Sequence, residues 1–222
     1  MGHILVREVL LFHFMKSDQD HRKTDSSKRI IRKNIQKARE SQDYHFRLSA
    51  SLIITDKLMG LDYYKASKEI LAYYPFRSEI DTAIIIRKAL KQKKKVILPK
   101  VNGKKLDLYY IEDLKNDLGP GIFDIMEPIP SKCTTASYEN IDIILVPGVG
   151  FDRGFNRLGH GGGFYDKLLE KLPAKTPRIA LAFNVQLIED IPVMAHDLKV
   201  DIIITEKEIL VSGNNSEYLI KK

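Results

Sequence analysis

The apolar stretch "IDIILVPG" (residues 141–148), joined by a short connection to "RLGHGGGFYDKLL" (157–169), decides the expected fold. The first stretch is apolar on both faces, as strands buried inside a parallel sheet are. The second places three consecutive glycines directly before a helical pattern. Ligands of open α/β sheets bind beyond the carboxyl ends of the strands. This strand–loop–helix segment therefore predicts a parallel sheet with a binding site at its edge.

The rest of the chain continues the alternation of strands and helices. Asn102-Gly103 lies between two apolar runs and predicts an antiparallel hairpin. Ser26-Ser27 is expected to cap a basic helix that starts at Lys28. The pattern predicts a three-layer α/β sandwich with a mostly parallel sheet. The other expected strands are residues 69–75, 94–101, 105–112, 178–184 and 200–205, and the expected helices are 28–42, 44–59, 79–92 and 164–171.

Length and composition indicate one globular domain. The 222 residues are enough to bury a hydrophobic core without stabilising disulfides or metal sites. We expect a single α/β catalytic domain over 26–211, an N-terminal extension over 1–25 that is disordered or not native, and a tail over 212–222. The apolar start is interrupted by Arg7 and Glu8, is too short for a membrane helix and lacks signal-peptide features.

Charge and cysteine content restrict the partners and the compartment. The single cysteine, Cys133, excludes an internal disulfide framework and favours a cytoplasmic location. The net charge of +7 favours an anionic partner: a nucleotide, another polyanionic small molecule or a nucleic acid. No nucleic-acid-binding motif is recognisable, so we expect no nucleic-acid partner and no membrane contact, and a monomer or weak dimer.

The glycine stretch is a candidate phosphate site. Glycines allow backbone N–H groups to approach a phosphate closely, and a helix start favours anions. Arg157 before the glycines suits phosphate, and Asp166 after them suits Mg²⁺. Neither a Walker loop nor a dinucleotide fingerprint is present. A closely packed turn without a ligand is the alternative.

Two further sets of polar residues have both a functional and a structural interpretation. Lys28 and Arg32 are four residues apart and share a helical face, which is either a solvated basic face or part of a binding site. Asp197, before the last strand, is either a metal ligand or an ordinary loop residue. No serine or cysteine lies in a nucleophile context, so a hydrolase triad is not expected.

Together, "VPGVGFDRGFNRLGHGGGFYDKLL", "LAFNVQLIEDIPVMAHDLKVD" and "KRIIRKNI" resemble the 5-formyltetrahydrofolate cyclo-ligase (methenyltetrahydrofolate synthetase) family. The resemblance spans roughly residues 28–205. It implies the α/β fold shared with sugar-phosphate isomerases and CoA transferases. It also implies ATP- and Mg²⁺-dependent conversion of 5-formyltetrahydrofolate to 5,10-methenyltetrahydrofolate, with release of ADP and phosphate after phosphorylation of the formyl oxygen.

The resemblance also assigns roles to residues. It makes Arg157 and Lys28 catalytic, Asp166 and Asp197 ligands of Mg²⁺, and Asp152 a residue that only shapes its loop. Tyr74 and Glu79 contact folate, although a core tyrosine and a helix N-terminal acid are their alternatives. The implied ATP-binding residues are Lys28, Arg29, Arg32, Arg157, Leu158, Gly159, His160, Gly161, Gly162, Gly163, Phe164 and Tyr165; those implied for folate are Arg32, Tyr74, Glu79, His160, Gly161 and Gly162.

Two positions depart from the family pattern. Some members carry arginine where this chain has His160, and lysine where it has Gly162. Both changes remove fixed positive charge from the loop, so phosphate stabilisation should depend more on Arg157, Lys28, Mg²⁺ and backbone N–H groups. The alternative functions are a non-catalytic nucleotide or sugar-phosphate sensor on the same fold, and a basic nucleic-acid-binding protein.

Overall fold

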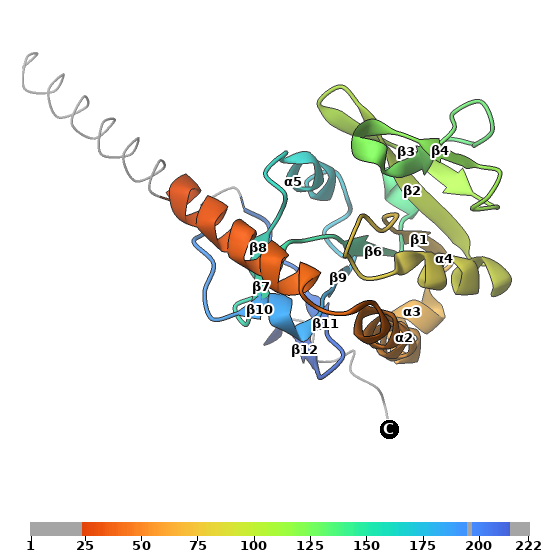
Figure 1. The fold of residues 1–222 in the computed structure, drawn as a ribbon. Helices are drawn as coiled ribbons and strands as arrows, with labels where there is room; N and C mark the ends of the chain where they lie inside the picture. Colours follow the sequence, from red (N-terminus) through yellow and green to blue (C-terminus); the bar gives the residue numbers. More distant parts are fainter. Residues whose placement is uncertain (1–23, 195–196, 214–222) are drawn as a thin grey trace, which may run out of the picture.

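A seven-stranded sheet forms the centre of the molecule (Figure 1). The computed structural model describes residues 24–194 and 197–213. Strands β11, β9, β6, β1 and β2 run parallel, and β12 and β3 pair antiparallel at the two edges. The expected mostly parallel sheet is confirmed. In the order of the sheet, the strands are β12 (Ile209–Val211), β11 (Ile202–Ile204), β9 (Arg178–Leu181), β6 (Ile143–Val146), β1 (Glu69–Leu71), β2 (Lys95–Asn102) and β3 (Lys105–Ile111).

An apolar core on each face of this sheet produces the three layers. Successive residues of a strand point to opposite faces, so Ile143 belongs to one core and Ile144 to the other. Helices α2 (Tyr44–Gly60), α3 (Asp62–Ala66) and α4 (Thr82–Lys91) cover the first face, and α5 (Phe164–Leu169) packs on the second. Each fully buried Leu or Ile contributes roughly 1.5–3 kcal/mol to this packing.

The expected elements are present, with corrected boundaries. The strand expected over residues 69–75 ends at Leu71, and the chain then leaves the sheet as a loop. Helix α4 begins at Thr82 rather than at residue 79, because the Asp81 carboxylate caps it by accepting from Ala83 N. The chain is already helical at residue 24, so the expected cap at Ser26-Ser27 is wrong. Serine disfavours a helix interior only weakly.

Short elements complete the fold. The expected β2–β3 hairpin is present, but Asn102 is the last residue of β2, and the turn is formed by Gly103 and Lys104. Among the described residues, no helix is long and apolar enough to cross a membrane. The extension over 1–25 and the tail over 212–222 lie almost wholly outside the described residues and stay predictions. The remaining elements are β4 (Leu118–Pro120), β5 (Met126–Pro128), β7 (Gly150–Asp152), β8 (Arg157–Leu158), β10 (Leu187–Ile188), and the 3₁₀ helices Ile122–Asp124, Tyr138–Asn140 and Asn184–Gln186.

A small second sheet carries the glycine loop at the carboxyl end of β6. Strand β7 lies between β10 and β8 in it. The Asp152 carboxylate accepts from the backbone N–H groups of Asn156 and Ile191, which agrees with a loop-shaping role. The helix over residues 24–40 lies against this sheet (Figure 1). A Cβ at Gly150 would come 2.5 Å from Ile35 Cδ1 of that helix, so the packing is close.

Gly121→Ala should lower the free energy of unfolding by about 1–3 kcal/mol, because the added methyl group overpacks a filled site. Its Cβ would lie 2.3 Å from Glu127 Cδ, and Lys100 Nζ holds that carboxylate at 3.1 Å. At the end of α2, Gly60→Ala meets no atom within 4 Å and should raise stability by about 0.5–1 kcal/mol. Urea unfolding measures both; equal effects would contradict the packing argument.

Candidate functional site

The glycine loop presents free backbone donors. Gly163, with φ of 65°, is the N-cap of α5, and Gly161 has φ of 99°; both values favour glycine. Within the described part of the chain, the backbone N–H groups of residues 160–163 donate no hydrogen bond. Unpaired N–H groups on a loop of this kind form an anion-binding concavity. The loop thus has the geometry expected of a phosphate cradle.

Arg157 lies beneath this loop and supports it. The side chain is only 5% exposed; its Nη2 lies 2.5 Å from Asp166 Oδ1, and its Nη1 donates to Pro147 O at 3.3 Å. A Cβ at Gly159 would come 2.6 Å from Nη1, so the loop backbone passes directly over the guanidinium. Arg157 Nε is buried without a hydrogen-bond partner in the described residues. The guanidinium therefore retains unused donor capacity next to the loop.

The basic helix over residues 24–40 lies against the other side of the loop. Lys28 Nζ lies 2.5 Å from Asp197 Oδ2, and this lysine side chain is 7% exposed. Arg32 Nε donates to Gly159 O at 2.8 Å. The structure thus joins three segments far apart in sequence, and a purely solvated basic face does not describe Lys28. Arg29 is exposed and is not brought into this group.

Glu79 connects the predicted folate segment to the glycine loop. Its Oε1 lies 3.0 Å from His160 Nε2, and its Oε2 accepts from Phe76 N at 3.1 Å. The carboxylate is 8% exposed although it sits in a loop. Tyr74, in the same segment, is half-buried and packs against the core that α2 and α4 cover. The segment predicted to bind folate and the loop predicted to bind ATP therefore meet at the Glu79–His160 contact.

Tyr73, which is buried, and Tyr165, which is half-buried, both interact electrostatically with this carboxylate. Burial, with a further contribution from Glu79, raises the pKa of Tyr73 and of Tyr165 well above the usual tyrosine range. The Tyr165 hydroxyl is buried and has no hydrogen-bond partner in the described residues. Both phenols therefore remain neutral donors at physiological pH. Sequence reasoning missed Tyr73, because its pattern is that of a core residue.

The two predicted Mg²⁺ ligands are each paired with a cation. Asp166 contacts Arg157, and Asp197 contacts Lys28 and accepts from Met194 N at 2.7 Å. No cluster of three metal-ligating side chains occurs among the described residues. Mg²⁺ commonly takes only one or two carboxylates when substrate phosphates and waters supply the other oxygens. The donor set fits an ion that arrives with a polyphosphate better than a resident protein-bound metal.

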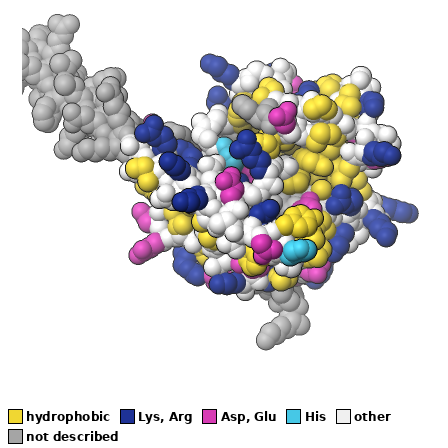
Figure 2. Space-filling view, in the orientation of Figure 1, with side chains coloured by type: hydrophobic (Ala, Val, Ile, Leu, Met, Phe, Trp, Pro, Cys, Tyr) yellow, Lys and Arg dark blue, Asp and Glu magenta, His cyan; other side chains and the backbone are white. Residues whose placement is uncertain are grey.

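The surface around the site combines positive charge with apolar area. Figure 2 shows Lys and Arg side chains along the helix over residues 24–40 and apolar side chains gathered around the β2–β3 hairpin. A charged phosphate chain needs a basic surface, and a flat aromatic ring system needs an apolar one. The face suits a ligand pair of this mixed character.

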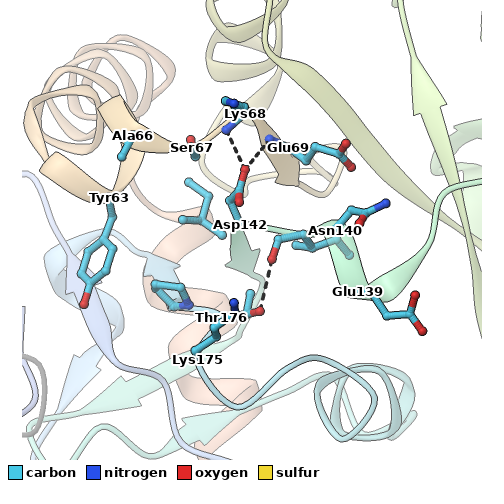
Figure 3. Close-up of a pocket in the computed structure, with 13 residues that line it drawn as sticks. Tyr63, Ala66, Ser67, Lys68, Glu69, Glu139, Asn140, Asp142, Lys175 and Thr176 are labelled. Atoms are coloured by element: carbon cyan, nitrogen blue, oxygen red, sulfur yellow. Dashed lines mark hydrogen bonds between the residues drawn. The ribbon is translucent and has the colours of Figure 1, made fainter.

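A separate hollow of about 510 Å³ lies at the opposite, amino ends of the strands (Figure 3). Asp142 Oδ2 accepts from the backbone N–H groups of Lys68 and Glu69, and Thr176 donates to Ile141 O. These polar groups satisfy one another and hold the loops that join the strands. The hollow is distinct from the site at the glycine loop.

The fold and this site define a class of protein: a three-layer α/β protein with a glycine-rich loop that presents free backbone N–H groups at the carboxyl edge of its sheet. The family model of the 5-formyltetrahydrofolate cyclo-ligase family matches residues 24–206. The chain belongs to this family, as the sequence resemblance indicated.

Relatives agree with this assignment. The chain is 30% identical over 198 residues to 5-formyltetrahydrofolate cyclo-ligase of Mus musculus, covering 82% of this chain and 95% of the mouse protein. It is 31% identical over 167 residues to the Haemophilus influenzae cyclo-ligase, covering 73% and 88%. The solved structure of Aquifex aeolicus 5,10-methenyltetrahydrofolate synthetase superposes with a TM-score of 0.75 at 35% identity, covering 83% of this chain and 92% of that one.

Proposed function

We propose that this protein converts 5-formyltetrahydrofolate to 5,10-methenyltetrahydrofolate, with ATP as the co-substrate that its family uses. The observation that supports this most directly is the contact of Glu79 with His160 at 3.0 Å. This contact places the carboxylate that is predicted to bind folate beside the loop that is predicted to bind the triphosphate of ATP. Two substrates bound on either side of this contact lie close enough to react. Positioning of this kind supplies most of the catalysis in phosphoryl transfer.

The chemistry requires little covalent participation by the protein. The formyl oxygen attacks the γ-phosphate and ADP leaves; N10 then attacks the activated carbon, and the ring closes as phosphate leaves and N10 loses its proton to solvent. In our proposal Arg157, Lys28 and the loop N–H groups neutralise the phosphoryl oxygens. Glu79 accepts hydrogen bonds from the pteridine, and Tyr74 provides apolar contact.

Asp166 and Asp197 would hold a Mg²⁺ that accompanies ATP, and the ion would supply further positive charge at the phosphates. For this, each carboxylate must turn from its cation toward the metal. Arg157 and Lys28 are then free to contact phosphate oxygens. Substrate binding thus replaces ion pairs within the protein by contacts with the ligands. Each charged side chain keeps a partner of opposite charge.

We further infer a monomer or weak dimer in the cytoplasm, acting on small molecules and not on nucleic acid. The single cysteine supports a reducing compartment. The basic surface is accounted for by the two anionic substrates. Size-exclusion chromatography with light scattering measures the oligomeric state directly.

The proposed activity is tested by mixing the purified protein with 5-formyltetrahydrofolate and Mg·ATP and following the near-ultraviolet absorbance of the methenyl product. We expect product to form only when both ATP and Mg²⁺ are present. A folded protein that binds ATP without turnover would instead support the nucleotide sensor. Steep salt-dependent binding to generic DNA or RNA would support the nucleic-acid alternative.

A further inference from the structure

Arg39 is a buried cation that the proposed reaction does not use. It lies near the end of the helix over residues 24–40 and is 3% exposed. Its Nε donates to Ser78 Oγ at 3.0 Å. Its Nη1 is buried without a hydrogen-bond partner in the described residues and lies 4.0 Å from Glu79 Oε1. The unsatisfied donor is therefore adjacent to the carboxylate that we assign to folate binding.

Glu79 needs a cation at this depth, since a buried carboxylate is costly unless it is paired. Arg39 from the first helix and His160 from the glycine loop are the side chains that lie against it, and Tyr73 and Tyr165 interact with it electrostatically. Neutral tyrosines supply no compensating charge. The histidine is 45% exposed and carries charge only when protonated. Arginine is always charged, so Arg39 is the permanent counter-charge of this group.

We propose that Arg39 is a positioning residue for the folate half of the site: it compensates the charge of Glu79 and fixes the orientation of its carboxylate without touching either substrate. The proposal rests on the function proposed above. It differs from a purely structural role, in which Arg39 only ties the first helix to Ser78. A structural role predicts losses shared by both substrates, whereas a positioning role predicts a loss confined to folate.

The test compares Arg39→Met, Arg39→Lys, Glu79→Gln and the double variant Arg39→Met/Glu79→Gln. The dissociation constant for 5-formyltetrahydrofolate is measured by calorimetry, and the KM values for both substrates by turnover. We expect Arg39→Met to weaken folate binding about tenfold and to leave the KM for ATP within about twofold. Arg39→Lys, which keeps the charge, should recover most of the affinity. In the Glu79→Gln background, Arg39→Met should cause no further loss of folate affinity.

Lys94→Met is the matched control. Lys94 is a half-buried cation whose ammonium binds Tyr64 O and Ser67 O at the amino ends of the strands, away from the site. It should lower stability and leave folate affinity unchanged. If Arg39→Met does not fold, Arg39→Gln takes its place as the uncharged variant.

Three results overturn the proposal: equal losses for folate and ATP, no recovery in Arg39→Lys, or a full additional loss in the Glu79→Gln background. In each of these cases a wild-type protein that turns over still supports the proposed function. A wild-type protein that binds no folate removes both proposals together. Binding is measured separately from turnover, so the two failures are distinguishable.

Discussion

Arg157→Met should lower kcat/KM by about three orders of magnitude, the cost typical of removing a cation that stabilises a transferring phosphoryl group. The guanidinium lies directly beneath the glycine loop and has an unused Nε donor. Its removal takes away positive charge that would contact the phosphates. It also takes away the side chain on which the loop backbone rests. Steady-state kinetics with both substrates varied measures the effect.

Stability must be separated from catalysis in this variant, because breaking a buried pair costs about 3–5 kcal/mol. Arg157→Met leaves Asp166, 26% exposed, without its partner. The double variant Arg157→Met/Asp166→Asn removes that unpaired charge, so it should regain stability but not activity. Arg153→Met is the control: Arg153 is 64% exposed, pairs with Glu208 and should keep activity within about twofold. Activity of Arg157→Met within tenfold of wild type would refute the phosphate role.

The main sheet could be predicted because its strands are apolar on both faces and turn residues bound them. All the expected strands occur, since a short continuous apolar run bounded by turn residues is typical of a strand buried on both faces. The missed strands have two or three residues each, which is too short for any periodicity to show; they are β4, β5, β7, β8, β10 and β12. Strands β7, β8 and β10 are defined by their pairing with one another and by the packing of Gly150 against Ile35 of the first helix.

The site was predictable only where its residues are neighbours in sequence. Glycines before a helix indicate a phosphate loop by local chemistry, and Arg157 and Asp166 belong to the same segment. The pairing of Lys28 with Asp197 spans 169 positions and follows from the topology, which no local pattern encodes. The family resemblance supplied both residues but not their contact.

Arg39 illustrates a signal that was present but not used. Residues 28, 32, 35 and 39 follow helical spacing and therefore share one face. On that face Lys28 contacts Asp197, Arg32 contacts the glycine loop and Ile35 packs against the small sheet. A charged residue that continues a face already assigned to a site is a candidate for that site. Applied to the sequence, this criterion would have included Arg39.

Lys28→Met should lower kcat/KM for ATP about 100-fold, the upper range expected for a buried hydrogen bond to a charged group. The ammonium is 7% exposed and its carbon chain fills space beside Asp197, so methionine preserves the packing. The variant loses the positive charge for phosphate and the ammonium that contacts Asp197, whose Oδ2 still accepts from Met194 N. Two negative groups, the carboxylate and the triphosphate, then face each other without the ammonium between them. The ATP dissociation constant and KM should rise together.

Because this loss has two sources, Asp197→Asn in the Lys28→Met background separates them. Removing the carboxylate relieves the repulsion, so ATP affinity should recover in part, whereas kcat should stay low because the phosphate cation is still missing. Lys33→Met, on an exposed position of the same helix, controls for helix charge and should change the KM for ATP less than twofold. If Lys28→Met and Lys33→Met weaken ATP equally, the helix acts only through its net charge, and the buried Lys28–Asp197 pair is structural.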